Sequence, residues 1–474
     1  MKNNRPFSEV RAEILQGKVS VLDLVLQHLS AAEEFKNLNA FLEIFSEEAV
    51  ERAKIIDKKI ASKTGGRLAG MILGIKDVFC YKDHKVSAGS KILSGFESQF
   101  TSTAIQRLLD EDAIIIGRQN CDEFAMGSSN ENSGYGPVLN YMGENRVPGG
   151  SSGGSAVGVQ AGICMASIAS DTGGSIRQPA AFCGLVGLKP TYSRISRSGL
   201  VAYGSSFDCV GPITRSVEDA ALLLEIMAGE DPMDSTSSSK SVDSYSKLED
   251  SDKKYTIGYL GSALHSDGLQ NEIKLAYEHS INVLKDAGHK VELVELPWLD
   301  YVLPVYYVLT TSESSSNLSR FDGIHYGHRS EKAKNLEEVY KLSRTEAFGP
   351  EVQRRIMLGT FALSADYYEA YFTKAQQVRR LIQNSAIEIF KKVDFLIMPT
   401  TPTTAFKIGE KSTNPLSMYL ADIFTVWANL AGIPAVNIPV GIDNEGMPIG
   451  LQVHADFFKE KEMLQFANNW SKMI

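Results

Sequence analysis

A glycine- and serine-rich stretch with an apolar interior is the feature that most limits the folds open to this chain. Residues 149–184 read GGSSGGSAVGVQAGICMASIASDTGGSIRQPAAFCG, and their only charged side chains are Asp171 and Arg177. A flexible linker would be polar throughout, whereas the segment GICMASIAS has the apolar content of a buried element. We therefore expect this stretch to lie inside a folded core.

Helical and strand-like patterns alternate along the chain. Residues 7–60 are predicted to be helical, with Ser20 capping a helix whose apolar residues fall on one face. Apolar runs ending near Lys76 and covering Ala113–Gly117 predict buried strands, and residues 271–296 repeat a helix followed by a strand. This alternation predicts an α/β fold with a largely buried sheet.

Two later segments add to this outline. Residues 393–406, VDFLIMPTTPTTAF, predict a core strand that runs into a loop rich in proline and threonine. Residues 230–254 are polar and acidic and are expected to form a solvated loop. No segment marks a strong domain boundary.

Composition limits the partners and the compartment. The formal net charge of −9 argues against a chain that grips nucleic acid by itself, although a partner of such a chain can do so. The start, MKNNRPFSEVRAEILQGK, has no apolar segment typical of a secretory signal, and no apolar run is long enough for a membrane span. Five scattered cysteines without a CxxC pair indicate buried thiols in a reducing cytoplasm: Cys80, Cys121, Cys164, Cys183 and Cys209.

The loop PGGSSGGSAVGV, residues 148–159, admits three interpretations. A phosphate-binding loop would carry a lysine after its last glycine, but no basic residue follows Gly154 before Arg177. The apolar flank AVGVQAGICMA argues against a linker. The third interpretation is a backbone of unusual geometry around a functional serine, where glycines relieve steric limits.

A second serine loop, SDTGGSIRQPAAFCG at residues 170–184, contains Ser175 directly after two glycines. The successive backbone N–H groups of Thr172, Gly173 and Gly174 can point at one spot and stabilise the oxyanion of an acyl transfer. A helix that begins after this loop would add its positive end. The short pattern GGS is by itself a weak signal.

A serine nucleophile needs a base, and histidine is the usual one. The eight histidines all lie far from both loops in sequence, and none sits in a recognisable motif. A neutral lysine can serve instead, because burial lowers the pKa of a lysine. Lys76 lies between apolar residues in MILGIKDVF, so it is either functional or extends its ammonium group to solvent.

The run at residues 149–191 resembles the amidase signature. The resemblance implies a mostly buried, mixed central β-sheet with α-helices on both faces, in a single domain of residues 1–474. Its core would cover about 70–215, with a helical segment at 1–60 packed on it. The resemblance also implies a catalytic triad: Ser175 as nucleophile, Ser151 after a cis peptide bond as bridging serine, and Lys76 as base.

Five other segments resemble the glutamine-hydrolysing subunits of tRNA-dependent amidotransferases within this family: residues 122–140, 228–236, 312–330, 351–379 and 418–441. This resemblance implies that Arg355 binds the α-carboxylate of glutamine and that Asp422 binds its α-ammonium group, with Tyr306 as a further contact. Trp427 stands where a proline is expected, so packing near Asp422 is expected to differ.

The same resemblance implies a place in a larger complex. Ammonia from glutamine would pass to a B subunit that amidates mischarged Glu-tRNA(Gln), using ATP and Mg²⁺, and a small C subunit would complete a heterotrimer. No cofactor or metal is expected in this chain itself. Two alternatives stay open: a stand-alone amidase that acts on other carboxamides, and a scaffold subunit without activity.

Overall fold

One mixed β-sheet runs through the whole fold. The computed structural model describes residues 5–249, 252–266, 268–411 and 415–474. Within these ranges, eleven strands are joined in the order β1-β3-β2-β4-β6-β5-β10-β11-β9-β7-β8. The strands are β1 (Phe41–Ile44), β2 (Ile72–Lys76), β3 (Ile114–Gln119), β4 (Ala166–Asp171), β5 (Val186–Lys189), β6 (Cys209–Thr214), β7 (Thr256–Leu260), β8 (Lys290–Val294), β9 (Phe395–Pro399), β10 (Ala435–Ile442) and β11 (Pro448–His454).

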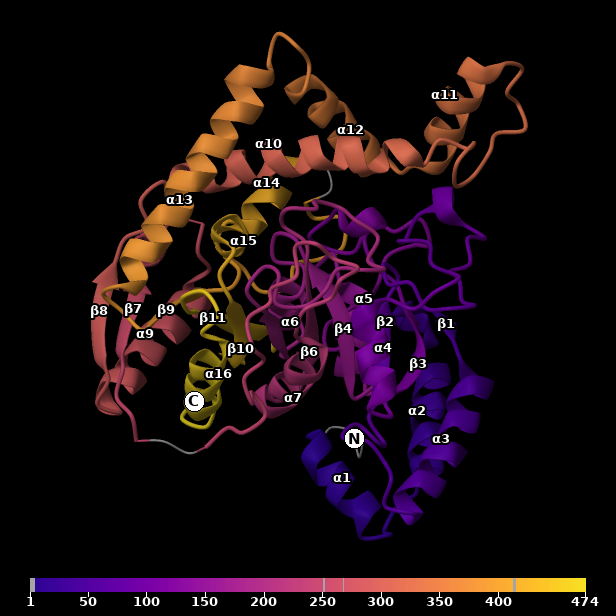
Figure 1. Cartoon of the computed structure of the whole chain (residues 1–474). Helices are drawn as coiled ribbons and strands as arrows, with labels where there is room; N and C mark the ends of the chain where they lie inside the picture. The colour runs from indigo at the N-terminus through magenta and orange to yellow at the C-terminus, as the bar shows by residue number, and fades with distance from the viewer. Residues whose placement is uncertain (1–4, 250–251, 267, 412–414) are drawn as a thin grey trace.

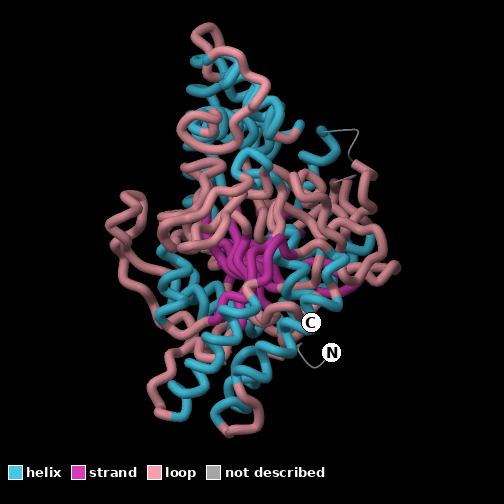
Figure 2. Tube along the Cα trace, turned by 90° about the vertical axis from the view of Figure 1, so that its right-hand side faces the viewer, coloured by secondary structure: helices cyan, strands magenta, loops and turns pink. Residues whose placement is uncertain are grey.

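Helices surround this sheet, and Figure 2 shows them on both sides of the strands. The α-helices are α1 (Phe7–Leu15), α2 (Val21–Glu34), α3 (Ser46–Ala61), α4 (Thr103–Asp110), α5 (Gly153–Gln160), α6 (Arg177–Phe182), α7 (Val217–Met227), α8 (Gly261–Leu264), α9 (Asn271–Asp286), α10 (Leu299–Asn317), α11 (Leu336–Ala347), α12 (Pro350–Ala362), α13 (Lys374–Phe390), α14 (Pro415–Tyr419), α15 (Val426–Ala431) and α16 (Glu460–Ser471). Shorter helical turns are η1 (Lys36–Leu38), η2 (Lys91–Leu93), η3 (Glu123–Ala125), η4 (Leu318–Arg320), η5 (Glu369–Thr373) and η6 (Leu420–Asp422).

The predicted α/β class and buried sheet are confirmed. Strands β2, β3 and β4 are parallel neighbours, while β4, β6, β5, β10, β11 and β9 pair antiparallel in turn. Every residue of β2, β3, β4 and β6 is buried. Their near-continuous apolar runs follow from this burial, because both faces of a covered sheet exclude water.

The N-terminal segment departs from the all-helical prediction for residues 7–60. Ser20 does cap α2 by accepting a hydrogen bond from the N–H of Asp23 at 3.0 Å. Between α2 and α3, however, β1 pairs antiparallel with β3 and forms an edge of the sheet. The FLEI segment is too short for a helical period, so pattern alone did not reveal this edge strand.

The prediction of a solvated loop at 230–254 is wrong in part, while residues 250 and 251 lie outside the described residues. Tyr245 is fully buried, and its hydroxyl accepts a hydrogen bond from Nε of Arg194 at 2.7 Å. Asp231 is also buried and accepts hydrogen bonds from the hydroxyls of Ser196 and Thr103. Polar partners in the fold, which composition cannot reveal, hold this segment in place.

Helices α10, α12, α14 and α15 form a layer above one end of the strands, as Figure 1 shows. Helix α12 packs closely on α10, because a Cβ at Gly359 would lie 2.0 Å from the backbone oxygen of Thr311. The loop after β4 meets this layer at Gly173, where a Cβ would lie 2.3 Å from Oη of Tyr306 on α10. No helix among the described residues is long and apolar enough to cross a membrane.

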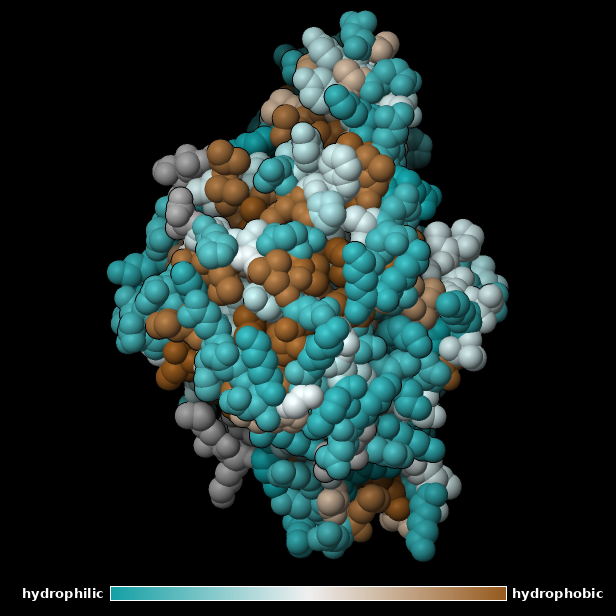
Figure 3. Space-filling view, turned by 90° about the vertical axis from the view of Figure 1, so that its left-hand side faces the viewer, coloured by the Kyte–Doolittle hydropathy of each residue, from teal (hydrophilic) through white to brown (hydrophobic). Residues whose placement is uncertain are grey.

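Strand β8 forms the edge of the sheet far from β1, and α13 lies on the same side of the molecule, at the left of Figure 1. Figure 3 shows apolar side chains among polar ones on this face. A groove of about 460 Å³ runs between β8 and α13, and Leu293, Trp298 and Leu381 contribute apolar side chains to it. All three side chains are exposed. The groove is thus a surface feature, distant in the fold from the serine loops.

The start of α5 provides a test of this packing. A Cβ at Gly154 would lie 2.3 Å from the backbone oxygen of Asn120 and 2.5 Å from that of Ala40. Gly154→Ala should therefore lower the free energy of unfolding by about 2–3 kcal/mol, although alanine intrinsically favours a helix by about 1 kcal/mol. Urea unfolding of the purified chain measures the change.

Gly441 supplies the matched control, because a Cβ at that position meets no atom within 4 Å. Gly441→Ala should leave the free energy of unfolding within about 0.5 kcal/mol of the parent value. Equal stability of the two variants would contradict the close approach of α5 to β3 and its neighbours.

Candidate active site

Lys76 ends β2 with its side chain inside the protein. It is fully buried, and Nζ donates hydrogen bonds to Oγ of Ser151 at 2.7 Å and to Oγ of Ser170 at 3.0 Å. Burial lowers the pKa of Lys76 to about 8, and the negative charges of Asp122 and Asp171 limit the fall. An amine with this pKa is partly neutral near physiological pH and can accept a proton.

Ser151 faces this amine from the first serine loop. The peptide bond between Gly150 and Ser151 is cis, as the family resemblance implied. The backbone oxygen of Ser151 accepts a hydrogen bond from the N–H of Asp122 at 3.1 Å. The carboxylate of Asp122 in turn accepts the backbone N–H groups of Asn130 and Asn132, each at 2.9 Å. These contacts hold the loop in the position that brings Ser151 to Lys76.

Ser175 lies in the second loop, between β4 and α6. Its side chain is almost buried, with 7% of the residue exposed, and within the described residues its hydroxyl makes no hydrogen bond. The hydroxyl is therefore available to a ligand. The structure brings both serine loops to the same end of the sheet, at the ends of the neighbouring strands β2 and β4.

The backbone around Ser175 changes one part of the predicted oxyanion site. The N–H of Gly174 already donates to Oδ1 of Asp171 at 2.8 Å, so it is not a free donor. The backbone N–H groups of Thr172 and Gly173 stay predicted donors to the oxyanion. Gly173 is held by Thr425, whose hydroxyl donates to its backbone oxygen at 2.6 Å, and a Cβ there would lie 2.3 Å from Oη of Tyr306.

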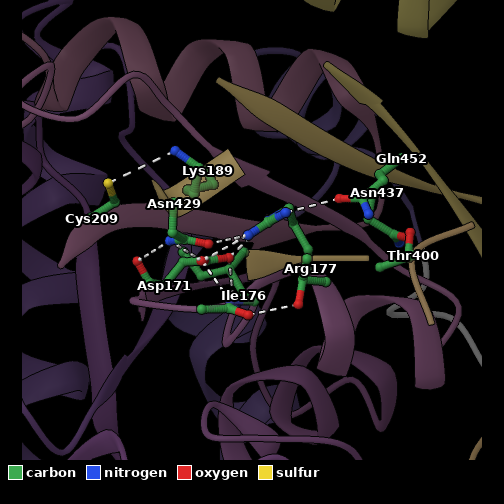
Figure 4. Close-up of polar contacts among 12 residues, drawn as sticks. Asp171, Ile176, Arg177, Lys189, Cys209, Thr400, Asn429, Asn437 and Gln452 are labelled. Carbon is green, nitrogen blue, oxygen red and sulfur yellow. Dashed lines mark hydrogen bonds and ion pairs between the residues drawn. The ribbon is translucent and has the colours of Figure 1, made fainter. Parts of the chain in front are cut away.

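A buried ion pair anchors this loop, as Figure 4 shows. Arg177 binds Asp171 through two hydrogen bonds of 3.0 Å, from Nε and from Nη2. Its remaining donors reach Asn429 on α15 at 2.7 Å and Gln452 on β11 at 2.8 Å. Burial alone would raise the pKa of Asp171, but Arg177 lowers it to about 2. The ionised pair ties the segment that carries Ser175 to the sheet and to α15.

A second fully buried lysine helps to distinguish the role of Lys76. Nζ of Lys189 donates to the backbone oxygen of Pro190 at 2.8 Å and contacts Sγ of Cys209 at 3.9 Å, as Figure 4 also shows. Burial lowers the pKa of Lys189 as well. Of the two, Lys76 is the lysine hydrogen-bonded to the loop serines. Both lysines are buried, so it is the position of Lys76 in the fold, and not its burial, that makes it the candidate base.

Arg355 extends from α12 into an aromatic enclosure. It is buried, and its guanidinium group lies over the rings of Tyr203, Tyr307 and Tyr419 at 5.5–5.8 Å from their centres. Nε donates to Oε1 of Glu351 at 2.8 Å, and Nη1 donates to Oη of Tyr203 at 2.8 Å. The guanidinium group is therefore held in one orientation, with donors left for a carboxylate.

Asp422 lies in η6, close to the same enclosure. Its Oδ2 accepts hydrogen bonds from the hydroxyls of Ser128 at 2.7 Å and Tyr307 at 3.1 Å, and Oδ1 accepts one from Nε2 of Gln178 at 3.2 Å. Burial raises the pKa of Asp422 to about 6, and the donors from Ser128 and Tyr307 limit the rise. The carboxylate is thus ionised at neutral pH. Tyr307 contacts both Asp422 and Arg355, so a negative and a positive side chain lie around the same tyrosine.

Tyr306 lies beside these residues on α10. It is buried, its ring meets that of Tyr307 at 5.1 Å, and burial raises its pKa well above the usual range. Its hydroxyl lies against Gly173 in the nucleophile loop, and within the described residues no hydrogen bond joins it to Arg355 or Asp422, although both charges act on it. A substrate contact for Tyr306 stays a prediction.

Trp427 does not disturb this arrangement. The side chain is fully buried in α15, with its ring 5.2 Å from that of His454 and 6.4 Å from that of Phe390. Its indole N–H has no hydrogen-bond partner in the described part of the chain. The indole fills the core, whereas Asp422 keeps its three donors, so the expected change in packing leaves that carboxylate in place.

Several residues of the site were not predicted from the sequence. Glu351 precedes Arg355 by one helical turn, a spacing that sequence alone can reveal. Ser170 lies on β4, on the strand next to that of Lys76, but nothing in its local sequence marks it. The others are far in sequence from Arg355 or Asp422 and meet them only in the fold: Ser128, Gln178, Tyr203 and Tyr307.

Comparison with known proteins shows the family of the chain. Residues 23–464 match the amidase family, so the chain belongs to this family. The A subunit of the glutamyl-tRNA(Gln) amidotransferase of Koribacter versatilis is 52% identical over 434 residues, covering 91% of the chain and 90% of the relative. The corresponding protein of Chlorobaculum parvum is 47% identical over 468 residues, covering 98% and 97%.

Solved structures show the same fold. The A subunit of the glutamyl-tRNA(Gln) amidotransferase of Thermotoga maritima has a TM-score of 0.78 at 36% identity, covering 95% of this chain and 94% of that chain. The peptide amidase of Stenotrophomonas maltophilia has a TM-score of 0.83 at 26% identity, covering 98% and 95%. These findings confirm the family and the fold inferred from the sequence.

Proposed function

We propose that this chain is the glutamine-hydrolysing subunit of a glutamyl-tRNA(Gln) amidotransferase. The names of its relatives and one observation of the site support the proposal. The buried Arg355 and the buried Asp422 share Tyr307 as a neighbour and lie beside the loop of Ser175. Opposite charges on either side of one tyrosine suit the α-carboxylate and α-ammonium groups of a free amino acid.

Glutamine binds with its carboxylate on Arg355 and its ammonium group on Asp422. The aromatic enclosure around the guanidinium group excludes water and strengthens both contacts. The side-chain carboxamide then extends toward Ser175. Because Glu351 and Tyr203 already orient Arg355, little further ordering is needed when the substrate arrives.

The first chemical step transfers the glutamyl group to the enzyme. Oγ of Ser175 attacks the carboxamide carbon, its proton passes to Oγ of Ser151, and the proton of Ser151 passes to neutral Lys76. The N–H groups of Thr172 and Gly173 stabilise the oxyanion. The proton returns through Ser151 to the leaving nitrogen, and the carbon–nitrogen bond breaks to release ammonia and leave a glutamyl ester on Ser175.

Water completes the cycle. Lys76, neutral again, accepts a proton from water through Ser151 while the oxygen attacks the ester carbon. Collapse of the intermediate returns a proton to Ser175 and releases glutamate. The net reaction consumes one glutamine and one water and yields one glutamate and one ammonia, and the proton of the new γ-carboxyl group passes to water. Every proton is thereby accounted for by groups of this chain and by water.

The ammonia is used by a partner. In the proposed complex, a B subunit binds the mischarged tRNA and, with ATP and Mg²⁺, activates and amidates its glutamate, while a C subunit completes a cytoplasmic heterotrimer. The acidic charge of this chain fits a division in which the partner binds the tRNA. We propose no cofactor for the glutamine-hydrolysing chain itself.

Substrate selectivity tests the proposal against a stand-alone amidase. Arg355→Ala removes the charged donors that hold the α-carboxylate, so kcat/KM for glutamine should fall by at least about 100-fold. Hydrolysis of butyramide, which has no carboxylate, should change less than about threefold. Ammonia release under steady-state conditions measures both.

The neighbouring Arg354 serves as a matched control, because it is more exposed and pairs with Glu351 on the outer side. Arg354→Ala should keep kcat/KM for glutamine within about threefold of the parent value. If the parent protein prefers butyramide and Arg355→Ala leaves glutamine hydrolysis intact, the chain is a general amidase. No hydrolysis of either amide by the native complex would instead favour an inactive scaffold.

The pH dependence of glutamine hydrolysis follows from two pKa values. Lys76 must be neutral, so kcat/KM should rise with pH and approach a plateau above pH 8. Asp422 must be ionised, so the fall should become steeper below pH 6. Steady-state rates between about pH 5.5 and 8.5 test this.

Asp422→Asn separates the contribution of Asp422 to the pH profile from that of Lys76. It should raise KM and abolish the steeper acid limb, while the rise toward pH 8 should persist. A rate that is flat from pH 6 to 8.5 in the parent protein would contradict Lys76 as the base.

A further inference from the structure

Gln178 lies between the two halves of the site. It belongs to the first turn of α6, three residues after Ser175, and its side chain is fully buried. Oε1 accepts a hydrogen bond from the backbone N–H of Gly150 at 3.2 Å. Nε2 donates a hydrogen bond to Oδ1 of Asp422 at 3.2 Å. One amide therefore joins the bridging-serine loop to the acidic residue of the amino-acid pocket.

The chemistry of an amide suits both neighbours. A carboxylate only accepts hydrogen bonds and a backbone N–H only donates them, so the side-chain orientation of Gln178 is determined by its partners. The other oxygen of Asp422, Oδ2, is already bound by Ser128 and Tyr307. Within the described residues, Gln178 is the one side-chain donor to Oδ1. Replacement of this amide thus changes how Asp422 is held.

We infer that Gln178 is a positioning residue that couples occupation of the ammonium site at Asp422 to the placement of Ser151. A substrate ammonium group that binds Asp422 sets the direction of the carboxylate. Gln178 follows this direction and holds the N–H of Gly150, whose next residue is the serine that accepts a hydrogen bond from Lys76. The inference rests on the proposed glutaminase function and adds a link between substrate recognition and the proton relay.

This link has a kinetic consequence. Glutaramate, which is glutamine without the α-amino group, keeps the carboxylate and the carboxamide but leaves Asp422 unoccupied. With the parent protein, it should show a higher KM and also a kcat at least about tenfold lower than glutamine. If Asp422 contributed only uniform binding, the loss of the amino group would raise KM and leave kcat unchanged.

The first variant is Gln178→Met, which keeps the volume and removes both hydrogen bonds. It should lower kcat for glutamine to near that for glutaramate, so that the kcat ratio of the two substrates falls from about ten or more to about one. The full-length chain, purified with the proteins that accompany it from its native host, is assayed by ammonia release. A ratio that stays at the parent value would overturn the inference, even if both rates fall.

The second variant is Gln178→Glu, which keeps an acceptor for Gly150 and loses the donor to Asp422 unless the pair shares a proton. The charged groups that face Asp422 are Arg355, Asp122 and Lys411, and all three stay unchanged in this variant. At lower pH the new carboxyl group and Asp422 share a proton, which restores the donor to Asp422. The kcat of the variant relative to the parent should therefore rise as pH falls. A relative kcat that does not depend on pH would also overturn the inference.

Gln160 offers a matched control. It is another buried glutamine whose amide bridges two backbone groups, the N–H of Tyr141 and the oxygen of Cys183, each at 3.1 Å. Gln160→Met should leave the kcat ratio of glutamine to glutaramate at the parent value. If the parent protein hydrolyses both substrates with equal KM and kcat, the proposed function fails and the inference fails with it; a parent preference that survives Gln178→Met defeats the inference alone.

Discussion

The buried amine of Lys76 is the constraint on which the rest of the site depends. An ammonium group without access to water is costly, so its environment must either neutralise it or surround it with acceptors. Here two hydroxyls, from Ser151 and Ser170, lie within hydrogen-bond distance of Nζ, and burial brings the pKa close to neutrality. The first serine loop has to come within reach of that nitrogen, and the glycines around Ser151 let the chain approach so closely.

The other buried charged side chains have structural or binding roles instead of a role in proton transfer. The pair of Asp171 and Arg177 is ionised and fully hydrogen-bonded, so it anchors the loop of Ser175 instead of taking part in proton transfer. Arg355 and Asp422 come from the helical layer above the sheet and meet through Tyr307. In the proposed mechanism, the sheet and its loops carry the proton relay, whereas the layer above carries recognition.

Sequence alone predicted the core better than the periphery. The apolar runs of β2, β3 and β4 and the two serine loops are local patterns, and Lys76 was singled out because it ends one of those runs. The edge strand β1 and the buried Tyr245 were missed, because their burial depends on partners far away in the chain. Gln178, Tyr203 and Tyr307 were missed for the same reason. Arg355 and Asp422 came from family resemblance, and no pattern of spacing joins them.

Direct capture of the covalent intermediate tests the central claim that Ser175 attacks while Lys76 and Ser151 carry the proton. The native complex is quenched with acid during turnover of glutamine, digested and mapped by mass spectrometry. We expect a glutamyl ester on the peptide of Ser175, absent in Ser175→Ala and strongly reduced in Lys76→Met. An ester on Ser151, Ser152 or Ser170, or full turnover by Ser175→Ala, would contradict it.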